Sequence, residues 1–461
     1  MEELIKDNNL EPENDSESVC AAPVEAKETD NAVVSEQKTN AVESADIENA
    51  NDIEDSDIDA EIDTIVSEEI AELVKMAAAE VETRKELKNQ AQQEENKKSR
   101  RKALETVQLI GCRIFGVITI LAMFFVFFMG FTYGYHTTLE MTEISFLQEQ
   151  GYYRLSSVGD YKLNIYKAGN SLSPYKVICL SGLGINDYGM RMSLVHNELK
   201  DEVQFVYVDR AGYGASDDTT ETQTIERIVD DYRKALKNAG LNPPYVLMPH
   251  SFGGVYATYW QSKYPEEIKG IVFLDGTYLN SDSELDDKEV ITRADELWTE
   301  IAQLGFYRYD SSYIDELPAC FSEKDIELSK IMQLQSVATY ANLSEQREYV
   351  ANYQKACAVL VATEIPKIYI SSIVGFQTRE EVKEYFDWDY NEAVKVGYND
   401  ERADKLIAQC AETREWLMPY SDNLGNTELV YLPGDHCIFM QKPVELANII
   451  RDFLYSLDGE E

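Results

Sequence analysis

Short apolar runs alternate with amphipathic segments through residues 136–461, and turn residues separate them. The apolar runs predict buried strands at 176–180, 203–208, 244–248, 271–274, 368–374 and 428–432. Helical spacing predicts helices at 188–199, at 224–239, from the turn at 251 to about 264, and at 444–454. Residues 152–157 and 161–167 flank Gly159-Asp160 and predict a hairpin. This alternation indicates an α/β fold with a mostly parallel sheet and helices on both faces.

Residues 280–364 lack a strand as strong as these, and their pattern is mostly helical. We therefore predict a helical cap inserted at about 280–364. The cap is rich in aromatic residues, namely Trp298, Phe306, Tyr307, Tyr309 and Tyr313. Two interpretations stay open: the rings line an apolar acyl pocket, or they only pack the cap.

Ile114 to Phe131 forms a run of 18 residues without a charge. With Leu109, Ile110, Tyr133 and Tyr135, the segment 109–135 is long enough to cross about 30 Å of hydrocarbon. It is apolar all round, which argues against a buried core helix. More than 100 residues precede it, which argues against a cleaved signal peptide. The pattern predicts one transmembrane helix at 109–135.

Residues 1–60 are rich in Asp and Glu and contain no aromatic side chain, so they predict a disordered acidic tail. From about residue 61 to 108, apolar side chains recur at helical spacing among many charges, which predicts a charged helix. This helix is either a solvated helix with a weak apolar stripe, or a coiled-coil or partner-docking helix. For the acidic tail we expect a cytoplasmic partner.

A basic cluster, Lys97-Lys98 with Arg100, Arg101 and Lys102, precedes the apolar run. On the other side no Lys or Arg occurs before Arg154. The positive-inside rule then places the N-terminus in the cytoplasm. We expect a single-pass protein of the cell membrane, with residues 136–461 as an extracytoplasmic globular domain.

Composition excludes several classes of function. The net charge of -42 argues against nucleic-acid binding, which needs a basic face. Seven cysteines in 461 residues are too few for a disulfide scaffold, and no Cys-x-x-Cys motif indicates a zinc site. No Gly-x-Gly-x-x-Gly follows a strand and no Gly-Lys-Ser loop occurs. We therefore expect neither a cofactor nor a metal.

Ser251 lies between a predicted strand and a predicted helix, in the turn Pro249-His250-Ser251-Phe252-Gly253. A tight strand–turn–helix needs small or constrained residues two positions before and after the Ser, because the backbones approach closely. Such a turn holds a hydroxyl above the sheet at a helix N-terminus. The pattern is Gly-x-Ser-x-Gly with Pro249 in place of the first Gly, and it predicts a nucleophile.

A serine hydroxyl needs a base, and the sequence has only four histidines: His136, His196, His250 and His436. His436 follows the last predicted strand, whereas His136 abuts the membrane, His196 lies on an early helix and His250 is expected to point away. His436 is therefore the predicted base.

A carboxylate should orient the imidazole. Asp275, at the end of the strand 271–274, is the first candidate, and Asp387 or Asp389 is the alternative.

An oxyanion formed at this Ser needs two backbone donors. The first should be the N–H of Phe252, the residue after the nucleophile. The second should come from the loop Ser181-Gly182-Leu183-Gly184, where Leu183 is the candidate because the flanking glycines let the backbone turn inward.

The ordered segments SGLG, DRAGYGAS, PHSFGG, IVFLD and PGDHCIFMQKP resemble the α/β-hydrolase fold superfamily over about residues 150–456. The resemblance implies a Ser-His-Asp hydrolase with a helical cap. Three departures stand out: Pro249 replaces the usual Gly, Ser181 replaces a frequent His, and an acid after the strand 368–374 is absent. Ser at the elbow, not Asp, argues against epoxide or haloalkane hydrolysis.

The sequence thus predicts a membrane-anchored serine hydrolase that cleaves a small-molecule ester, thioester or amide through an acyl-enzyme. Two rivals remain. One is a non-catalytic binding module on the same fold. The other is an acyltransferase or peptidase that uses the same three residues.

Overall fold

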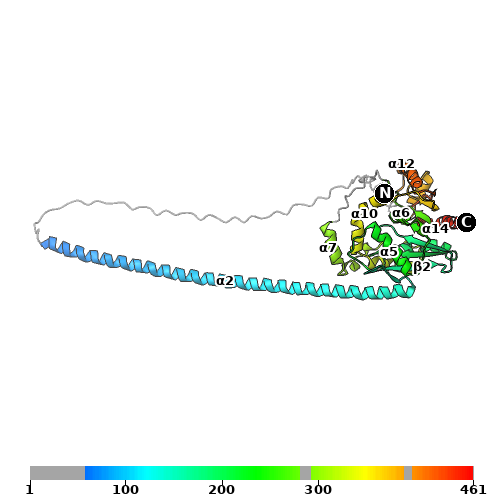
Figure 1. Cartoon of the computed structure of the whole chain (residues 1–461). Helices are drawn as coiled ribbons and strands as arrows, with labels where there is room; N and C mark the ends of the chain where they lie inside the picture. The colour runs from blue at the N-terminus through cyan, green and yellow to red at the C-terminus, as the bar shows by residue number, and fades with distance from the viewer. Residues whose placement is uncertain (1–57, 281–291, 389–396, 460–461) are drawn as a thin grey trace. The chain divides into compact units, whose positions relative to one another are not determined.

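The computed structural model describes residues 58–280, 292–388 and 397–459 (Figure 1). The chain divides into two units, Met1–Val107 and Gln108–Glu461. The predicted disordered tail at 1–60 lies almost wholly outside the described residues.

One helix, α2 (Ile58–Gln150), contains both the predicted charged helix and the predicted membrane span, and it continues to Gln150. Ile70, Leu73 and Val74 on its charged part are exposed. The helix carries a stretch that is long and apolar enough to span a membrane, by length and composition. Its last turns enter the globular core, where Leu147 is fully buried.

An eight-stranded sheet forms the centre of the second unit, in the order β1-β2-β4-β3-β5-β6-β7-β8. Its strands are β1 (Leu155–Ser157), β2 (Lys162–Gly169), β3 (Tyr175–Leu180), β4 (Val203–Val208), β5 (Tyr245–Pro249), β6 (Ile268–Leu274), β7 (Lys367–Ser371) and β8 (Thr427–Tyr431). β1 and β2 pair antiparallel as the predicted hairpin, and β2 pairs antiparallel with β4. All pairings from β4 to β8 are parallel, as the sequence predicts.

Side chains alternate along the strands and fill two separate cores, one on each face of the sheet. On β3, Ile178 and Leu180 belong to one core, and Val177 and Cys179 to the other. The first core is covered by α5 (Ile225–Asn238), α6 (Gly253–Lys263) and the end of α12 (Asp400–Leu424). The second is covered by α3 (Tyr188–Arg191), α4 (Ser193–Leu199), α13 (Ile438–Gln441) and α14 (Pro443–Ser456).

The predicted elements differ from the observed ones at a few places. The helix expected at 188–199 is two short helices, α3 and α4. The strand expected at 368–374 stops at Ser371, because the next residues turn, with a hydrogen bond from the Gly375 N–H to the Ser372 carbonyl. The helices α11 (Arg379–Phe386) and α12 were not predicted.

The cap comprises α7 (Arg293–Ala302), two short 3-10 helices η2 (Phe306–Tyr309) and η3 (Ser311–Tyr313), α8 (Glu323–Gln335), α9 (Tyr340–Arg347) and α10 (Tyr349–Val359). No strand interrupts it among the described residues, which omit 281–291 of the predicted range. Trp298 stacks on Tyr313, and Tyr307 meets Tyr313 edge-on. These three rings therefore pack against one another.

Candidate active site

The carboxyl ends of the parallel strands bring four loops to one edge of the sheet. Ser181–Gly184 follows β3, Ser251 follows β5, Asp275 follows β6, and the loop with His436 follows β8. In open α/β sheets, ligands bind in the crevice outside this edge. The predicted site residues therefore come from four separate segments that meet at one place.

Ser251 occupies a tight turn between β5 and α6. Its φ is 51°, in the left-handed region that non-glycine residues rarely adopt, so the turn is strained. The backbone on both sides is fixed: the Ser251 N–H donates to the Leu274 carbonyl, and the Ser251 carbonyl accepts from Gly254 and Thr277. A Cβ on Gly253 would lie 2.5 Å from the Leu180 carbonyl oxygen, so only glycine fits there.

Asp275 and His436 are in direct contact. The His436 Nδ1 lies 2.6 Å from the Asp275 Oδ2. The other carboxylate oxygen accepts from the Ser372 N–H at 2.9 Å, and the carboxylate is almost fully buried. Because a carboxylate only accepts, Nδ1 carries the hydrogen, which leaves Nε2 of the imidazole as a proton acceptor.

His250 joins the nucleophile turn to the loop of His436, a link the sequence did not predict. Its Nε2 donates to the His436 carbonyl oxygen at 3.0 Å, and the two ring centroids are 4.5 Å apart. Burial lowers the pKa of His250 well below its ordinary value, with a smaller effect from His436, so its ring stays neutral. The chain places His250 next to Ser251, so Ser251 and His436 belong to one packed cluster.

The loop after β3 lies against the nucleophile. A Cβ added to Gly182 would be 2.8 Å from the Ser251 Cβ, so the backbone can approach this closely only as glycine. In the described part of the chain, neither the Leu183 N–H nor the Phe252 N–H donates to a protein acceptor. The two N–H groups therefore have no protein acceptor there.

Arg210 fixes this loop from inside the protein, and the sequence did not reveal this role. Its guanidinium donates to the carbonyl oxygens of Ser181 (2.7 Å) and Gly182 (2.8 Å). On its other side it forms an ion pair with Glu345 of α9, whose carboxylate also accepts from the Tyr256 hydroxyl. The ion pair is fully buried, so the cap and the loop after β3 are tied together.

Of the two alternative acids, Asp387 does not contact His436: it is exposed at the C-terminal end of α11 and pairs with Lys383 of that helix. Asp389 lies outside the described residues. Asp435 precedes His436, but its carboxylate accepts from the Cys437 N–H, and burial raises its pKa. Asp275 is the carboxylate in contact with the His436 ring.

The remaining histidines lie elsewhere. His196 on α4 is hydrogen-bonded to the Tyr207 hydroxyl, and burial lowers its pKa to about 3. His136 on α2 accepts from the Arg308 guanidinium. The six cysteines of the described residues are free.

Comparison with curated proteins finds partial matches. The chain is 36% identical over 141 residues to the uncharacterized protein YbdG of Bacillus subtilis (strain 168), covering 31% of this chain and 42% of that protein. It is 28% identical over 133 residues to a proline iminopeptidase of Saccharolobus solfataricus, covering 28% of this chain and 41% of that enzyme. The chain thus spans less than half the length of these relatives.

Solved structures with a similar fold include a thermophilic esterase from Thermogutta terrifontis. It is 17% identical, with a TM-score of 0.43 over 66% of this chain and 97% of that one. The model of the alpha/beta hydrolase fold family matches residues 177–443, which is more than half of the chain. With the sheet order and the strand-edge site described above, this match shows that the chain belongs to the alpha/beta hydrolase fold family.

Proposed function

We propose that the protein is a membrane-anchored serine hydrolase that cleaves a carboxylic ester through an acyl-enzyme. Ser251 is the nucleophile, His436 the general base and acid, and Asp275 the carboxylate that orients the imidazole. The N–H groups of Phe252 and Leu183 form the oxyanion hole. No cofactor or metal takes part.

The reaction proceeds in two halves. The Ser251 Oγ attacks the acyl carbonyl while the His436 Nε2 takes the hydroxyl proton, and Asp275 stabilises the resulting imidazolium. The carbonyl oxygen becomes an oxyanion that accepts from the two backbone donors. The tetrahedral intermediate collapses, and His436 protonates the leaving alcohol. Water, deprotonated by His436, then releases the acid and restores Ser251.

The single observation that carries the proposal is the hydrogen bond between His436 and Asp275, 2.6 Å long, beside a strained Ser at the end of β5. Three features have no common structural purpose: strain at Ser251, a buried carboxylate bonded to the imidazole of His436, and a glycine-containing loop that approaches Ser251 closely. They do have a common catalytic one.

Ester is favoured as the substrate class, with amide or thioester behind it. The proline iminopeptidase match covers only part of that enzyme and leaves a peptidase as the second candidate. Transfer of the acyl group to an alcohol or amine needs the same residues. Product analysis with added alcohol or amine acceptors separates hydrolysis from transfer.

A fluorophosphonate probe tests the enzymatic activity directly. We expect one label per chain in the wild type and none in Ser251→Ala. Ser216→Ala is the matched control, since Ser216 is also a partly buried loop serine near the sheet edge, and it should label normally. A folded wild type that takes no label would favour the rival, a binding module on a hydrolase fold.

The anchor and its orientation belong to the same proposal. The apolar stretch 109–135 spans the cell membrane, the basic cluster at 97–102 stays in the cytoplasm, and residues 136–461 face outward. Protease added to intact cells should digest 136–461 and spare 1–96. The opposite protection pattern would reverse the orientation. A cytoplasmic partner for the acidic tail remains a prediction.

A further inference from the structure

One face of α2 is covered by the globular domain well inside the apolar stretch. Phe128, Thr132, His136, Glu140 and Ile144 recur every four residues and share a helix face. Thr132 is only 1% exposed, although neighbouring side chains such as Phe131 and Tyr133 are open. The domain therefore contacts α2 as far down as Phe128.

The contact is made by the cap segment η2. The Phe306 ring lies 5.9 Å from the Phe128 ring, and the Tyr309 ring stacks 6.1 Å from the Tyr135 ring. Gly305, just before η2, approaches so closely that a Cβ there would lie 2.3 Å from the His136 Cβ. Gly305 and η2 thus pack closely against α2.

The polar groups of η2 face inward. The Arg308 guanidinium forms a two-pronged ion pair with Glu143, at 2.6 and 2.9 Å, and also donates to the His136 Nδ1 at 2.8 Å. The Tyr307 hydroxyl donates to the Leu334 carbonyl at 2.9 Å. Phe306 and Tyr309 take no part in these polar contacts, and the Tyr309 side chain is 56% exposed.

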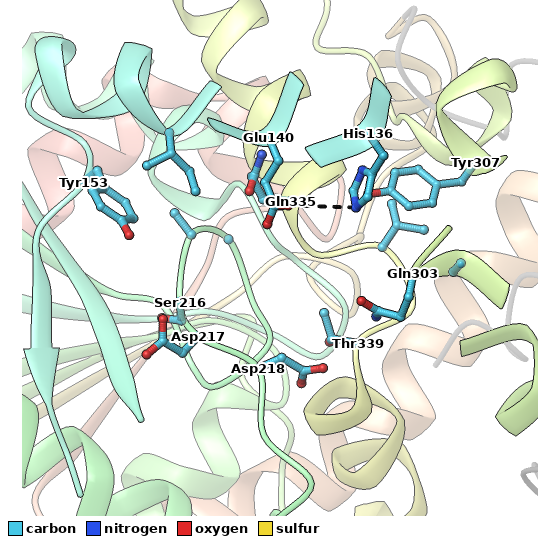
Figure 2. A pocket seen from close by; sticks show the side chains of 15 residues that line it. His136, Glu140, Tyr153, Ser216, Asp217, Asp218, Gln303, Tyr307, Gln335 and Thr339 are labelled. Carbon is cyan, nitrogen blue, oxygen red and sulfur yellow. Dashed lines mark ion pairs between the residues drawn. The ribbon is translucent and has the colours of Figure 1, made fainter. Parts of the chain in front are cut away.

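The space behind the turn is polar. A cavity of about 270 Å³ is lined by His136 and Glu140 of α2, by Gln303 and Tyr307 of the cap, and by Asp217 and Asp218. Figure 2 shows the two aspartates on the side opposite His136. Mostly polar side chains thus face this cavity, and the Phe306 and Tyr309 rings are not part of its lining. A surface of this polarity suits an apolar or amphipathic neighbour.

The position of Phe128 sets the depth. From Ile114, about 20 residues at about 1.5 Å each cross the hydrocarbon and reach Tyr133. Phe128 then lies about 7 Å inside the outer boundary. Phe306 packs on Phe128, so it lies at the same depth, and Tyr309 lies at the level of Tyr135, where interfacial aromatic residues gather.

We propose that the cap docks on the bilayer: η2 inserts Phe306 and Tyr309 into the outer boundary between acyl chains and headgroups, beside the end of the α2 span. The occupant of this aromatic surface is lipid. The Arg308 guanidinium bonds to His136 and Glu143, which follow Tyr133 on α2, so its charge lies outside the hydrocarbon and is paired with Glu143. The inference rests on the proposed membrane span of α2.

Bromine-quenched tryptophan fluorescence tests the docking on the full chain in nanodiscs that hold one copy each. The emission added by Phe306→Trp, relative to the wild type, should be largely lost in lipids brominated near the glycerol end of the chains. Tyr309→Trp is the second position, because its exposed ring tolerates exchange. Leu172→Trp, 90% exposed on the turn between β2 and β3, is the control and should keep its emission.

Leu121→Trp, in the middle of the apolar run, separates the two proposals. Its emission should be lost in lipids brominated near the chain ends if α2 spans the membrane. Quenching of the tryptophan at 121 but at neither 306 nor 309 would overturn the docking and leave the anchor intact. No quenching at 121 would overturn the anchor itself. If Phe306 and Tyr309 instead form a contact between two copies of the chain, nanodiscs with one copy each contain no second copy to cover them. Tryptophans at 306 and 309 would then keep their emission in brominated lipid, and this result would overturn the docking.

Discussion

Arg210 and Glu345 form a fully buried ion pair, with 3.0 Å between the arginine Nε and a carboxylate oxygen, directly behind the proposed oxyanion loop. The remaining guanidinium nitrogens hold the carbonyl groups of Ser181 and Gly182. Since those carbonyls point to Arg210, the backbone after them is fixed as it turns past Ser251. The pair thus fixes the backbone that leads to the proposed donor, the Leu183 N–H.

Arg210→Lys should lower kcat with little change in KM. Lysine keeps the charge but cannot bond Ser181, Gly182 and Glu345 at once. Losing one oxyanion donor typically costs about 10²–10³-fold in rate, so a misplaced donor should cost up to about 10²-fold. The control is Arg233→Lys, which breaks a two-pronged pair with Glu267 away from the site and should leave kcat unchanged. An unchanged kcat in Arg210→Lys would remove this role.

Asp275→Asn should lower kcat by about 10⁴-fold, because the amide favours the wrong imidazole tautomer. Asp387→Asn is the comparison, since Asp387 is exposed and pairs only with Lys383 on its own helix. Steady-state kinetics on a soluble ester measure both. Equal rates for the wild type and Asp275→Asn would exclude Asp275 from the mechanism.

Acid should destabilise the fold through His196. Burial lowers its folded pKa to about 3, whereas the unfolded chain protonates near the ordinary value of 6.5. The unfolded state therefore binds more protons between these values, and stability falls as pH falls through this window. His196→Gln should make the free energy of unfolding less pH-dependent, by up to about 1.4 kcal/mol per pH unit.

Chemical denaturation in detergent at several pH values measures this slope. Tyr207→Phe is the control, because it removes the hydrogen-bond partner of His196 and leaves the titrating ring in place. The same slope in His196→Gln and the wild type would show that His196 does not titrate on unfolding.

Arg308→Met should destabilise the domain by up to about 3–5 kcal/mol, because Glu143 loses its ion-pair partner in a mostly buried place and keeps the Gln335 amide as a neutral donor. Arg293→Met is the matched control: Arg293 is exposed and pairs with Glu296 on the surface, so its loss should leave the melting temperature nearly unchanged. Thermal unfolding of the two variants tests the difference. Equal melting temperatures of the two variants would show that the Arg308–Glu143 contact between the cap and α2 does not stabilise the domain.

The sequence was sufficient for the sheet because each parallel strand is a compact apolar run between turn residues. It also located the strained turn at Ser251, since close backbone approach needs Gly253. It made Asp275 the first candidate but kept Asp387 and Asp389 open, because Asp275 and His436 are 161 residues apart in the chain. Only the pairing of β6 with β7 and β7 with β8 brings them together.

Other features left no local mark in the sequence. Arg210 pairs with Glu345, which is 135 residues away in the chain. The hydrogen bond between His250 and His436 forms only in the folded protein, where their two loops meet. The long helix α12 is polar on most sides and contains Pro419, so its apolar stripe is weak. For Arg210 and His250 the bonding partner comes from a distant segment, and the local sequence pattern carries no information about it.

Rapid-quench peptide mass spectrometry with p-nitrophenyl acetate shows whether Ser251 carries the acyl group. We expect one acetyl group on the peptide with Ser251 in the wild type, and none in Ser251→Ala or His436→Gln. Turnover of the ester with no acyl group on Ser251, or with the acyl group on another residue, would contradict this expectation.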